Sequence, residues 1–339
     1  MSDTKPLLAI TMGDPAGTGP EIVAKALAEP QVRAACRPLV IGDADTMREA
    51  LEITGAPGEV RAIGDVSEAG FDPALIEVLD LDNVDLGSLE RGRVSRMAGQ
   101  AAYEYVERAT TLAMAGTVDA IVTSAINKEA LNLAGHHYDG HTGLLSALTE
   151  TPKVTMMLVA GKLRIAHVST HVSLREALER VRPERILDVL HLADVGIRGL
   201  GVEKPRIAVS GLNPHAGEGG LFGDEEIRYI QPAIAEAVKR GLDVTGPYPG
   251  DTVFFRTLQG EFDGAIAMYH DQGHVAAKML GIWHGVNVTL GLPIIRTSVE
   301  HGTSFDKAGT GTADPRSMNG ALRLASTMAL SRKAATVGS

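Results

Sequence analysis

Short apolar runs alternate along the chain with longer segments in which apolar residues recur every three or four positions. The short runs have the length of strands, and the longer segments have the length and period of helices. This alternation is typical of an α/β protein with a largely parallel sheet. We predict strands at residues 7–12, 39–42, 75–79, 118–124, 154–159, 163–169, 206–210, 264–269, 286–290 and 294–298, and helices at 20–28, 44–53, 94–114, 128–134, 142–149, 173–180, 183–198, 224–240, 271–280 and 315–330.

The turn Gly161-Lys162 joins two predicted strands and indicates a hairpin, so we expect a mixed sheet. A length of 339 residues favours two domains. Because no linker-like segment separates them, we expect a discontinuous arrangement. Residues 1–130 and 290–339 would form one domain, and residues 131–289 would form the other.

Composition narrows the possible partners and the location. The chain carries 32 basic and 42 acidic residues, a net charge of −10, which argues against nucleic-acid binding because that needs a basic face. Its single cysteine, Cys36, excludes an internal disulfide and fits a reducing compartment. The apolar runs are too short to span a membrane, and residues 1–6 do not resemble a secretory signal. We therefore expect a cytoplasmic protein without nucleic-acid or membrane partners.

Three predicted strands each lead into a histidine, namely His171, His215 and His270. Ligands of open α/β sheets collect beyond the carboxyl ends of the strands, so these side chains are expected to converge there. Three neutral imidazoles suit a divalent ion such as zinc and leave coordination positions open for a substrate. A histidine after a strand can also serve as a cap or a core residue, and the pattern alone leaves both roles open.

Other polar residues stand where an anion could bind. His141 and Thr142 precede a predicted helix, whose first amide groups can hold phosphate or carboxylate. Arg296 could grip a phosphate with two parallel hydrogen bonds, whereas a lysine acts as a point charge. Asp271, directly after His270, could orient a ligand, move a proton or simply cap a helix.

Three glycine-rich segments, 13–19, 211–220 and 301–311, follow predicted strands. The first opens a helix, which favours an anion or nucleotide site. It lacks both the Gly-x-Gly-x-x-Gly fingerprint and the Gly-Lys-Ser/Thr ending of a P-loop, so a tight structural turn explains it equally well.

The chain resembles a known family in segments that occur in that family's order from about Leu8 to Leu330. It is similar to the 4-hydroxythreonine-4-phosphate dehydrogenases of pyridoxal-phosphate biosynthesis. The resemblance implies two α/β/α domains like those of isocitrate and isopropylmalate dehydrogenases, and a homodimer in which residues 131–289 form the metal, substrate and dimerisation domain. The segments that carry it include Gly13-Asp14-Pro15-Ala16-Gly17, Gly140-His141-Thr142, Ser169-Thr170-His171, Asn213-Pro214-His215, Tyr269-His270-Asp271-Gln272-Gly273 and Arg296-Thr297-Ser298.

The resemblance also assigns roles to individual residues. His171, His215 and His270 would bind a divalent metal at the subunit interface, with zinc the first choice and magnesium, cobalt or manganese as alternatives. Residues 301–309 look like the adenosine-binding loop of the related dehydrogenases, which implies NAD or NADP held by the domain of residues 1–130 and 290–339. Asp271 and Lys278 are candidates for proton movement. The phosphorylated substrate would be bound by His141, Thr142, Lys278, Asn287 and Arg296, and the cofactor by His301, Gly302, Asp306 and Gly309.

The implied reaction is the NAD(P)-dependent, metal-dependent oxidation and decarboxylation of a four-carbon 4-phosphorylated 3-hydroxy acid. Residues 9–15 and 169–175 look closer to paralogues that act on 4-phospho-threonate or -erythronate. Gly143 departs from the family pattern, which has glutamate there. A dehydrogenase of a non-phosphorylated cyclic diol carboxylate is the first alternative, although His141, Thr142 and Arg296 favour a phosphate. A metal-dependent hydrolase and a non-catalytic binding protein are further alternatives.

Overall fold

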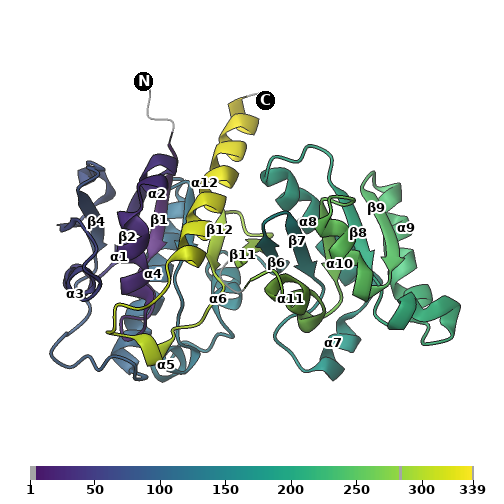
Figure 1. Ribbon diagram of the computed structural model, residues 1–339, viewed down its shortest axis with the longest axis horizontal. Helices are drawn as coiled ribbons and strands as arrows, with labels where there is room; N and C mark the ends of the chain where they lie inside the picture. The colour runs from purple at the N-terminus through teal and green to yellow at the C-terminus, as the bar shows by residue number, and fades with distance from the viewer. Residues whose placement is uncertain (1–4, 282–284, 338–339) are drawn as a thin grey trace. The chain divides into compact units, whose positions relative to one another are not determined.

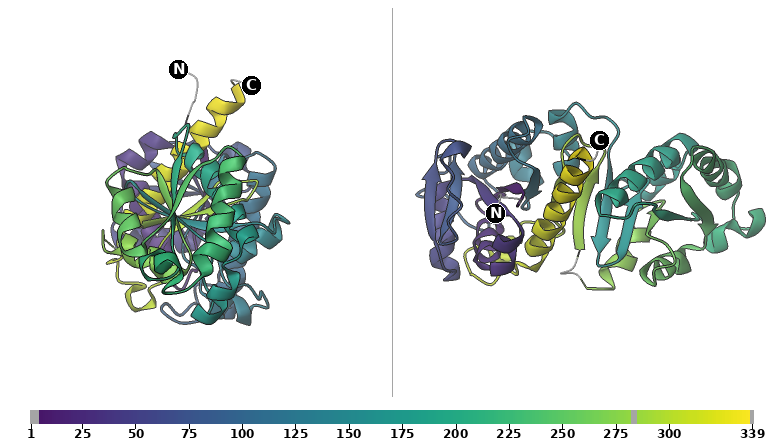
Figure 2. Two further views of the ribbon diagram at one scale, coloured as in Figure 1. Left: turned by 90° about the vertical axis from the view of Figure 1, so that its right-hand side faces the viewer. Right: turned by 90° about the horizontal axis from the view of Figure 1, so that it is seen from above.

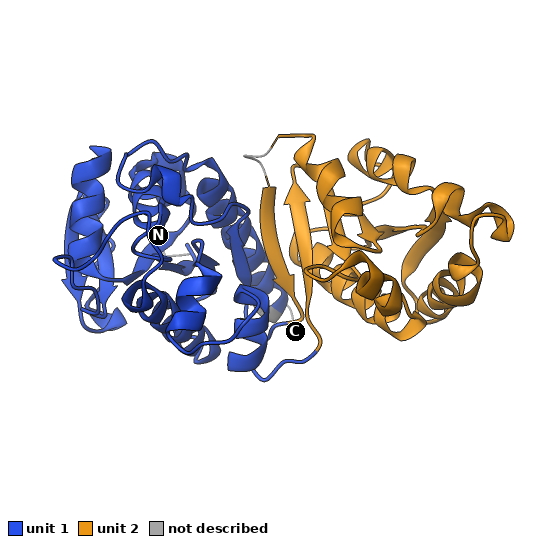
Figure 3. Ribbon diagram, turned by 90° about the horizontal axis from the view of Figure 1, so that it is seen from below, with its two compact units in different colours: residues 1–152, 292–339 blue, residues 153–291 orange. Residues whose placement is uncertain are grey.

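The computed structural model describes residues 5–281 and 285–337. The chain divides into two compact units, of which unit 1 comprises residues 1–152 and 292–339 and unit 2 comprises residues 153–291 (Figure 3). The first break lies beyond the expected position at residue 130. The reason is that α5 (Lys128–Leu133) and α6 (His141–Leu148) pack against α4 (Arg96–Met114) of unit 1.

Every described strand pair of unit 1 is parallel. The strands follow the order β3-β4-β2-β1-β5-β12. All residues of β1 and β5 are buried, which is why these strands appear in the sequence as continuous apolar runs. The bounds are β1 (Leu7–Thr11), β2 (Arg37–Gly42), β3 (Glu59–Ile63), β4 (Leu75–Asp80), β5 (Ala120–Thr123) and β12 (Arg296–Val299).

Helices cover both faces of this sheet. The helix α4 packs against β1, β2 and β5, and α12 packs against β12 and β5. In the right-hand view of Figure 2, α4 (blue) lies on one side of the strands and α12 (yellow) on the other. Besides α4, α5 and α6, unit 1 contains α1 (Gly19–Ala28), α2 (Pro30–Ala35), α3 (Ala44–Thr54) and α12 (Arg316–Val337).

Unit 2 contains a mixed sheet in the order β11-β6-β7-β10-β8-β9. The strand β6 runs antiparallel to both of its neighbours, and the other described pairs are parallel. The hairpin at Gly161-Lys162 and the mixed, mostly parallel α/β class are therefore confirmed. The bounds are β6 (Thr155–Ala160), β7 (Leu163–His167), β8 (Arg206–Ser210), β9 (Asp243–Tyr248), β10 (Gly264–Ala267) and β11 (Gly285–Leu290).

The helices of unit 2, labelled in Figure 1, also form two layers, which the right-hand view of Figure 2 shows on either side of the strands. The helix α8 packs against β7 and β10, and so do α10 and α11. Between α10, α11 and the sheet lies an apolar core that includes Leu158, Ile165, Phe254 and Phe262. The helices are α7 (Leu174–Arg180), α8 (Pro183–Gly199), α9 (Gln231–Lys239), α10 (Gly250–Leu258) and α11 (His270–Lys278), and a π-helical turn (Glu226–Ile230) precedes α9.

Four elements were not predicted, namely β3, β9, α2 and α10. The strands β3 and β9 lie at the edges of the sheets, and most of their residues are at least partly exposed, so no apolar run marks them. The helix α2 is one short segment with a single buried residue, Val32. Among the described residues, no helix is long and apolar enough to cross a membrane.

The contact between α4 and α5 yields a prediction of stability. A Cβ atom at Gly99 would overlap the carbonyl oxygen of Ala130. Alanine favours a helix over glycine by about 1 kcal/mol, yet we expect Gly99→Ala to destabilise the protein by about 1–3 kcal/mol, because the helices must move apart. Thermal unfolding measures the effect. Thr111→Ala, at an exposed site of the same helix, is the control, and an equal or higher melting temperature for Gly99→Ala would contradict the packing argument.

Candidate active-site residues in the two units

The predicted metal ligands follow three adjacent parallel strands of unit 2. His171 lies beyond the carboxyl end of β7, His270 beyond that of β10 and His215 beyond that of β8. The sheet order β7-β10-β8 sets these strands side by side, as the strand-end argument requires.

His171 and His270 lie close together, with ring centroids 5.5 Å apart. His270 is the first residue of α11, and its Nδ1 atom lies 2.7 Å from Oδ1 of Asp271. This contact lowers the pKa of Asp271. A carboxylate on one ring nitrogen fixes the orientation of the ring and leaves the other nitrogen to bind a ligand.

Two further histidines, His167 and His274, adjoin this pair. The ring of His274 stacks on that of His270 at 3.7 Å between centroids, and the centroids of His167 and His274 are 4.8 Å apart. Burial lowers the pKa of His167 to about 3 and that of His274 to about 4, so both are neutral imidazoles. Gly273 makes room for His167, because a Cβ atom there would lie 2.5 Å from Nε2 of His167.

His215 lies on an irregular, exposed turn. Every residue from His215 to Gly220 has a positive φ, between 46° and 102°, and the side chain of His215 is 63% exposed. Its Nδ1 atom lies 3.2 Å from Oε2 of Glu218. Within residues 5–281 and 285–337, no three His, Cys, Asp or Glu side chains form a group that could hold a metal ion. Because its side chain is 63% exposed, His215 is accessible to solvent on the surface of unit 2.

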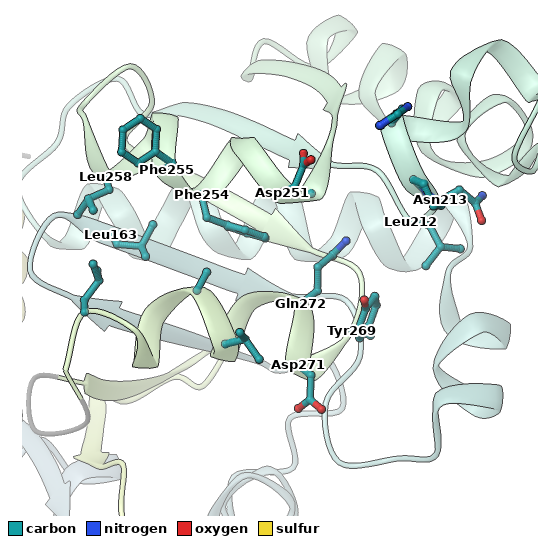
Figure 4. A pocket seen from close by; sticks show the side chains of 16 residues that line it. Leu163, Leu212, Asn213, Asp251, Phe254, Phe255, Leu258, Tyr269, Asp271 and Gln272 are labelled. Carbon is teal, nitrogen blue, oxygen red and sulfur yellow. The ribbon is translucent and has the colours of Figure 1, made fainter.

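A groove of about 840 Å³ lies beside this histidine on unit 2. Figure 4 shows Phe254, Leu258 and Leu163 toward one end and Asn213 and Leu212 at the other. Tyr269, Asp271 and Gln272 of the segment that carries His270 also line it, together with His215. The groove thus has an apolar part and a polar part, and the polar part contains two of the predicted site residues, Asp271 and His215.

The two remaining predicted residues of unit 2 lie on α11 and β11. Lys278 is exposed in the last turn of α11, and its positive charge acts on both Asp271 and His274. Asn287 lies on β11, and its buried Oδ1 atom has no hydrogen-bond partner within the described part of the chain. An unsatisfied buried acceptor suggests a polar ligand or a water molecule at that position.

Unit 1 holds the other predicted anion-binding residues. His141 and Thr142 begin α6, and the guanidinium of Arg296 donates two hydrogen bonds to Oγ1 of Thr123, at 3.1 and 2.7 Å. Burial lowers the pKa of Arg296 to about 9, so that the residue remains a cation at neutral pH. Burial, together with the charge of Arg296, keeps the pKa of His141 well below its usual range. A neutral imidazole, a buried cation and a helix N-terminus suit a phosphate.

The glycine that departs from the family pattern has a structural counterpart. A Cβ atom at Gly143 would collide with Oδ1 of Asp139. The space beside α6 that a side chain at position 143 would enter is thus occupied by a carboxylate from the preceding loop.

Two of the glycine-rich segments meet in unit 1. The buried carboxylate of Glu21 accepts hydrogen bonds from the amides of Gly309 and Gly311, at 2.6 and 2.8 Å. The amide and hydroxyl of Thr18 both donate to the carbonyl oxygen of Thr303. The loop 301–311 is therefore fixed against the loop 13–19. Within it lie the predicted cofactor residues His301, Gly302, Asp306 and Gly309.

Sequence reasoning missed several residues that shape these sites: His274, Gln272, Glu226 and Glu21. The four-residue spacing of His270 and His274 places both on one helix face, and this signal could have identified the stack. The side chain of Gln272 accepts from the amide of Met268 and donates to the carbonyl oxygen of Gly211, both at 2.7 Å. Nothing in the sequence pairs these distant positions.

The fold and these residues define a class of protein. It is a two-unit α/β protein with neutral imidazoles, a buried cation and loops held by hydrogen bonds, and it is suited to bind a small anionic substrate. Comparison with known proteins gives the family. Residues 34–325 match the model of the pyridoxal phosphate biosynthetic protein PdxA family, and the chain belongs to this family.

Individual proteins of similar sequence support this family assignment. The chain is 49% identical to D-threonate 4-phosphate dehydrogenase of Cupriavidus necator, over 98% of this chain and 100% of the relative. It is 44% identical to 4-hydroxythreonine-4-phosphate dehydrogenase of Trichlorobacter lovleyi, over 98% and 100%. A crystal structure of 4-hydroxythreonine-4-phosphate dehydrogenase from Klebsiella pneumoniae matches with a TM-score of 0.88 and 48% identity, and the match covers 96% of this chain and 100% of that chain.

The low pKa of His141 predicts a pH dependence of stability. Below about pH 6.5 the unfolded chain protonates this histidine while the folded protein does not, so stability falls as the pH decreases. We expect the free energy of unfolding to decrease between about pH 6.5 and 5 more steeply in the wild type than in His141→Gln. Urea denaturation at several pH values measures the slopes. Parallel slopes for the two proteins would show that His141 titrates normally.

Proposed function

We propose that the protein oxidises and decarboxylates a four-carbon 4-phosphorylated 3-hydroxy acid, using NAD or NADP and a divalent metal ion. The observation that carries the proposal is the buried cation Arg296 beside the neutral His141 at the start of α6. The relatives are named dehydrogenases of 4-phosphorylated acids, which supports the same assignment.

The phosphate end of the substrate would be held by His141, Thr142 and Arg296, and the family resemblance assigns Lys278 and Asn287 to the same substrate. Burial strengthens the attraction between Arg296 and an anion, because little water screens it. Holding the non-reacting phosphate fixes the orientation of the reacting carbon. This phosphate set also disfavours a non-phosphorylated cyclic diol carboxylate as the substrate.

His171, His215 and His270 would hold the metal, with zinc as the first choice because the donor set consists of imidazoles. The proximity of His171 to His270, and the carboxylate of Asp271 on the ring of His270, fit such a role. When bound, the metal would supply Lewis-acid chemistry at the substrate oxygens. Because His215 lies on an exposed turn, we propose that it completes the site in a second copy of the chain.

Other residues of the chain would bind the cofactor and move the proton. His301, Gly302, Asp306 and Gly309 would bind the nicotinamide cofactor, on a loop that Glu21 and Thr18 fix in place. When bound, the nicotinamide would supply a hydride acceptor at the substrate carbon, and the hydroxyl proton would pass to a base. Asp271 and Lys278 are the candidates for moving this proton. The resulting β-keto acid then releases carbon dioxide. A hydrolase would need no such cofactor loop.

We propose a threonate-type acid, without an amino group, as the preferred substrate. The relative at 49% identity bears that activity in its name, and residues 9–15 and 169–175 resemble the same branch.

The homodimer would use the exposed apolar side of α10 and α11. Phe255, Val275 and Met279 are 63%, 60% and 82% exposed, although each is apolar. Apolar clusters of this kind mark interaction surfaces. Phe255 and Val275 line the same groove as His215 and Asp271, so the surface adjoins the metal site for which we propose a second copy.

The activity assay tests the proposal directly. We expect metal-loaded protein to form NADH or NADPH, with equimolar carbon dioxide, from 4-phospho-D-threonate faster than from 4-hydroxythreonine 4-phosphate. Arg296→Ala should raise KM at least tenfold for phosphorylated acids, because a charge-assisted contact is worth about 1.5–3 kcal/mol. Turnover of 4-hydroxythreonine 4-phosphate alone would instead identify that compound as the substrate. No turnover of either compound, or an unchanged KM in Arg296→Ala, would contradict the assignment of these residues to a phosphate.

The dimer surface has its own test. We expect Val275→Glu to shift the protein from dimer to monomer in sedimentation velocity, because two buried carboxylates would face an apolar partner surface. Val238→Glu, at an exposed apolar position on α9, is the matched control and should leave the dimer intact. A dimer that persists in Val275→Glu would place the interface elsewhere.

A further inference from the structure

A buried carboxylate organises the turn that carries His215. Glu226 is 2% exposed and begins the π-helical turn before α9. Its Oε1 atom accepts from the amides of Leu212 and Asn213, both at 2.7 Å, and its Oε2 atom accepts from Nδ2 of Asn213 at 2.9 Å. These bonds fix the two residues that lead into Pro214 and His215.

The segment folds closely around this carboxylate. A Cβ atom at Gly217 would lie 2.7 Å from Oε2 of Glu226, and one at Gly211 would lie 3.1 Å from Oε1. A side chain at Gly217 would displace the carboxylate, and one at Gly211 would collide with Cα of Ala216, 2.7 Å from the added Cβ atom. The contacts join both sides of the turn, since Gly211 precedes His215 and Gly217 follows it.

The turn needs such support because its backbone is unfavourable. His215, Ala216 and Glu218 have φ values of 53°, 54° and 46°, a region that L-residues other than glycine seldom adopt. Residues persist there only where the surrounding structure holds them, and such strain gathers at functional sites. The hydrogen bonds of Glu226 supply the local restraint.

The side chain of Gln272 adds a link to the other histidines. It joins the carbonyl oxygen of Gly211, at the start of the turn, to the amide of Met268, two residues before His270. The turn is thus tied at its first residue to the segment of His270, and its next two residues are held by Glu226.

We infer that Glu226 is a positioning residue for metal binding: its carboxylate holds the left-handed turn that directs His215 toward the ion. The inference rests on the proposed role of His215 as a ligand. Glu226 itself does not bind the ion, and it acts through the backbone of residues 212–215. Groups that hydrogen-bond directly to a metal ligand typically affect metal affinity about 10–100-fold, and we expect the lower end of that range for a group that acts through the backbone.

The test measures the affinity of the full-length, metal-free protein for Co²⁺ and Zn²⁺, by competition with a chromophoric chelator. We expect Glu226→Gln to weaken binding by about tenfold, because the amide keeps one acceptor but directs N–H groups at another donor. Asn213→Ala should cause a smaller loss in the same direction, and it provides a second variant if Glu226→Gln does not fold. Asp224→Asn, an exposed carboxylate two residues away, is the control and should bind as the wild type does.

A double-mutant cycle separates positioning from general stability. If Glu226 acts through His215, Glu226→Gln should weaken binding in the wild type and have no further effect in His215→Ala. The same factor in both backgrounds, or unchanged affinity in both Glu226→Gln and Asn213→Ala, would overturn the inference while leaving His215 as a ligand. Unchanged affinity in His215→Ala would instead overturn the proposed ligand set, and the inference with it.

Discussion

The parallel pairing of β12 with β5 is the constraint on which unit 1 depends. It returns the last part of the chain to a sheet that the first part began, and Arg296 pairs in register with Ile121. Three consequences follow from this pairing. The guanidinium of Arg296 reaches the hydroxyl of Thr123, the loop 301–311 meets the loop 13–19, and α12 packs on β12 and β5. The pairing of this one strand therefore determines where the proposed phosphate and cofactor residues of unit 1 lie.

Buried carboxylates fix irregular loops in both units. Glu21 accepts two amides of the loop 301–311, and Glu226 accepts two amides of the turn that leads to His215. A carboxylate is costly to bury unless donors satisfy it, and backbone amides in irregular loops need acceptors in turn. The hydrogen bonds between carboxylate and amides therefore satisfy the buried carboxylate and the loop backbone together. It also lets a loop without regular secondary structure hold a defined shape, which catalytic and binding residues require.

The sequence predicted the alternating core elements well, because β1, β5 and β6 are buried on both faces and appear as apolar runs. It missed β3 and β9, whose partly exposed side chains at the sheet edges leave no such run. The strand-end argument predicted that His171 and His270 lie close together, because it depends only on strand order. It could not predict the exposure of the His215 side chain, since this depends on positive φ values at non-glycine residues and on the hydrogen bonds of Glu226, eleven positions away. Long-range pairs such as Gln272 with Gly211 likewise have no local signature.

The buried charge of Arg296 shows how the fold prepares for its proposed substrate. Removing a guanidinium from water is unfavourable, and its lowered pKa of about 9 reflects that cost. The hydroxyl of Thr123 accepts two of its hydrogen bonds. A phosphate would bring negative charge close to this cation where screening by water is weak, and His141, held neutral by burial and by the charge of Arg296, could donate a hydrogen bond to it from one ring N–H. Part of the free energy of the proposed phosphate binding would thus come from the desolvated cation of the folded protein. Because the phosphate would not react, this free energy would be available to orient the hydroxy acid at the other end of the substrate.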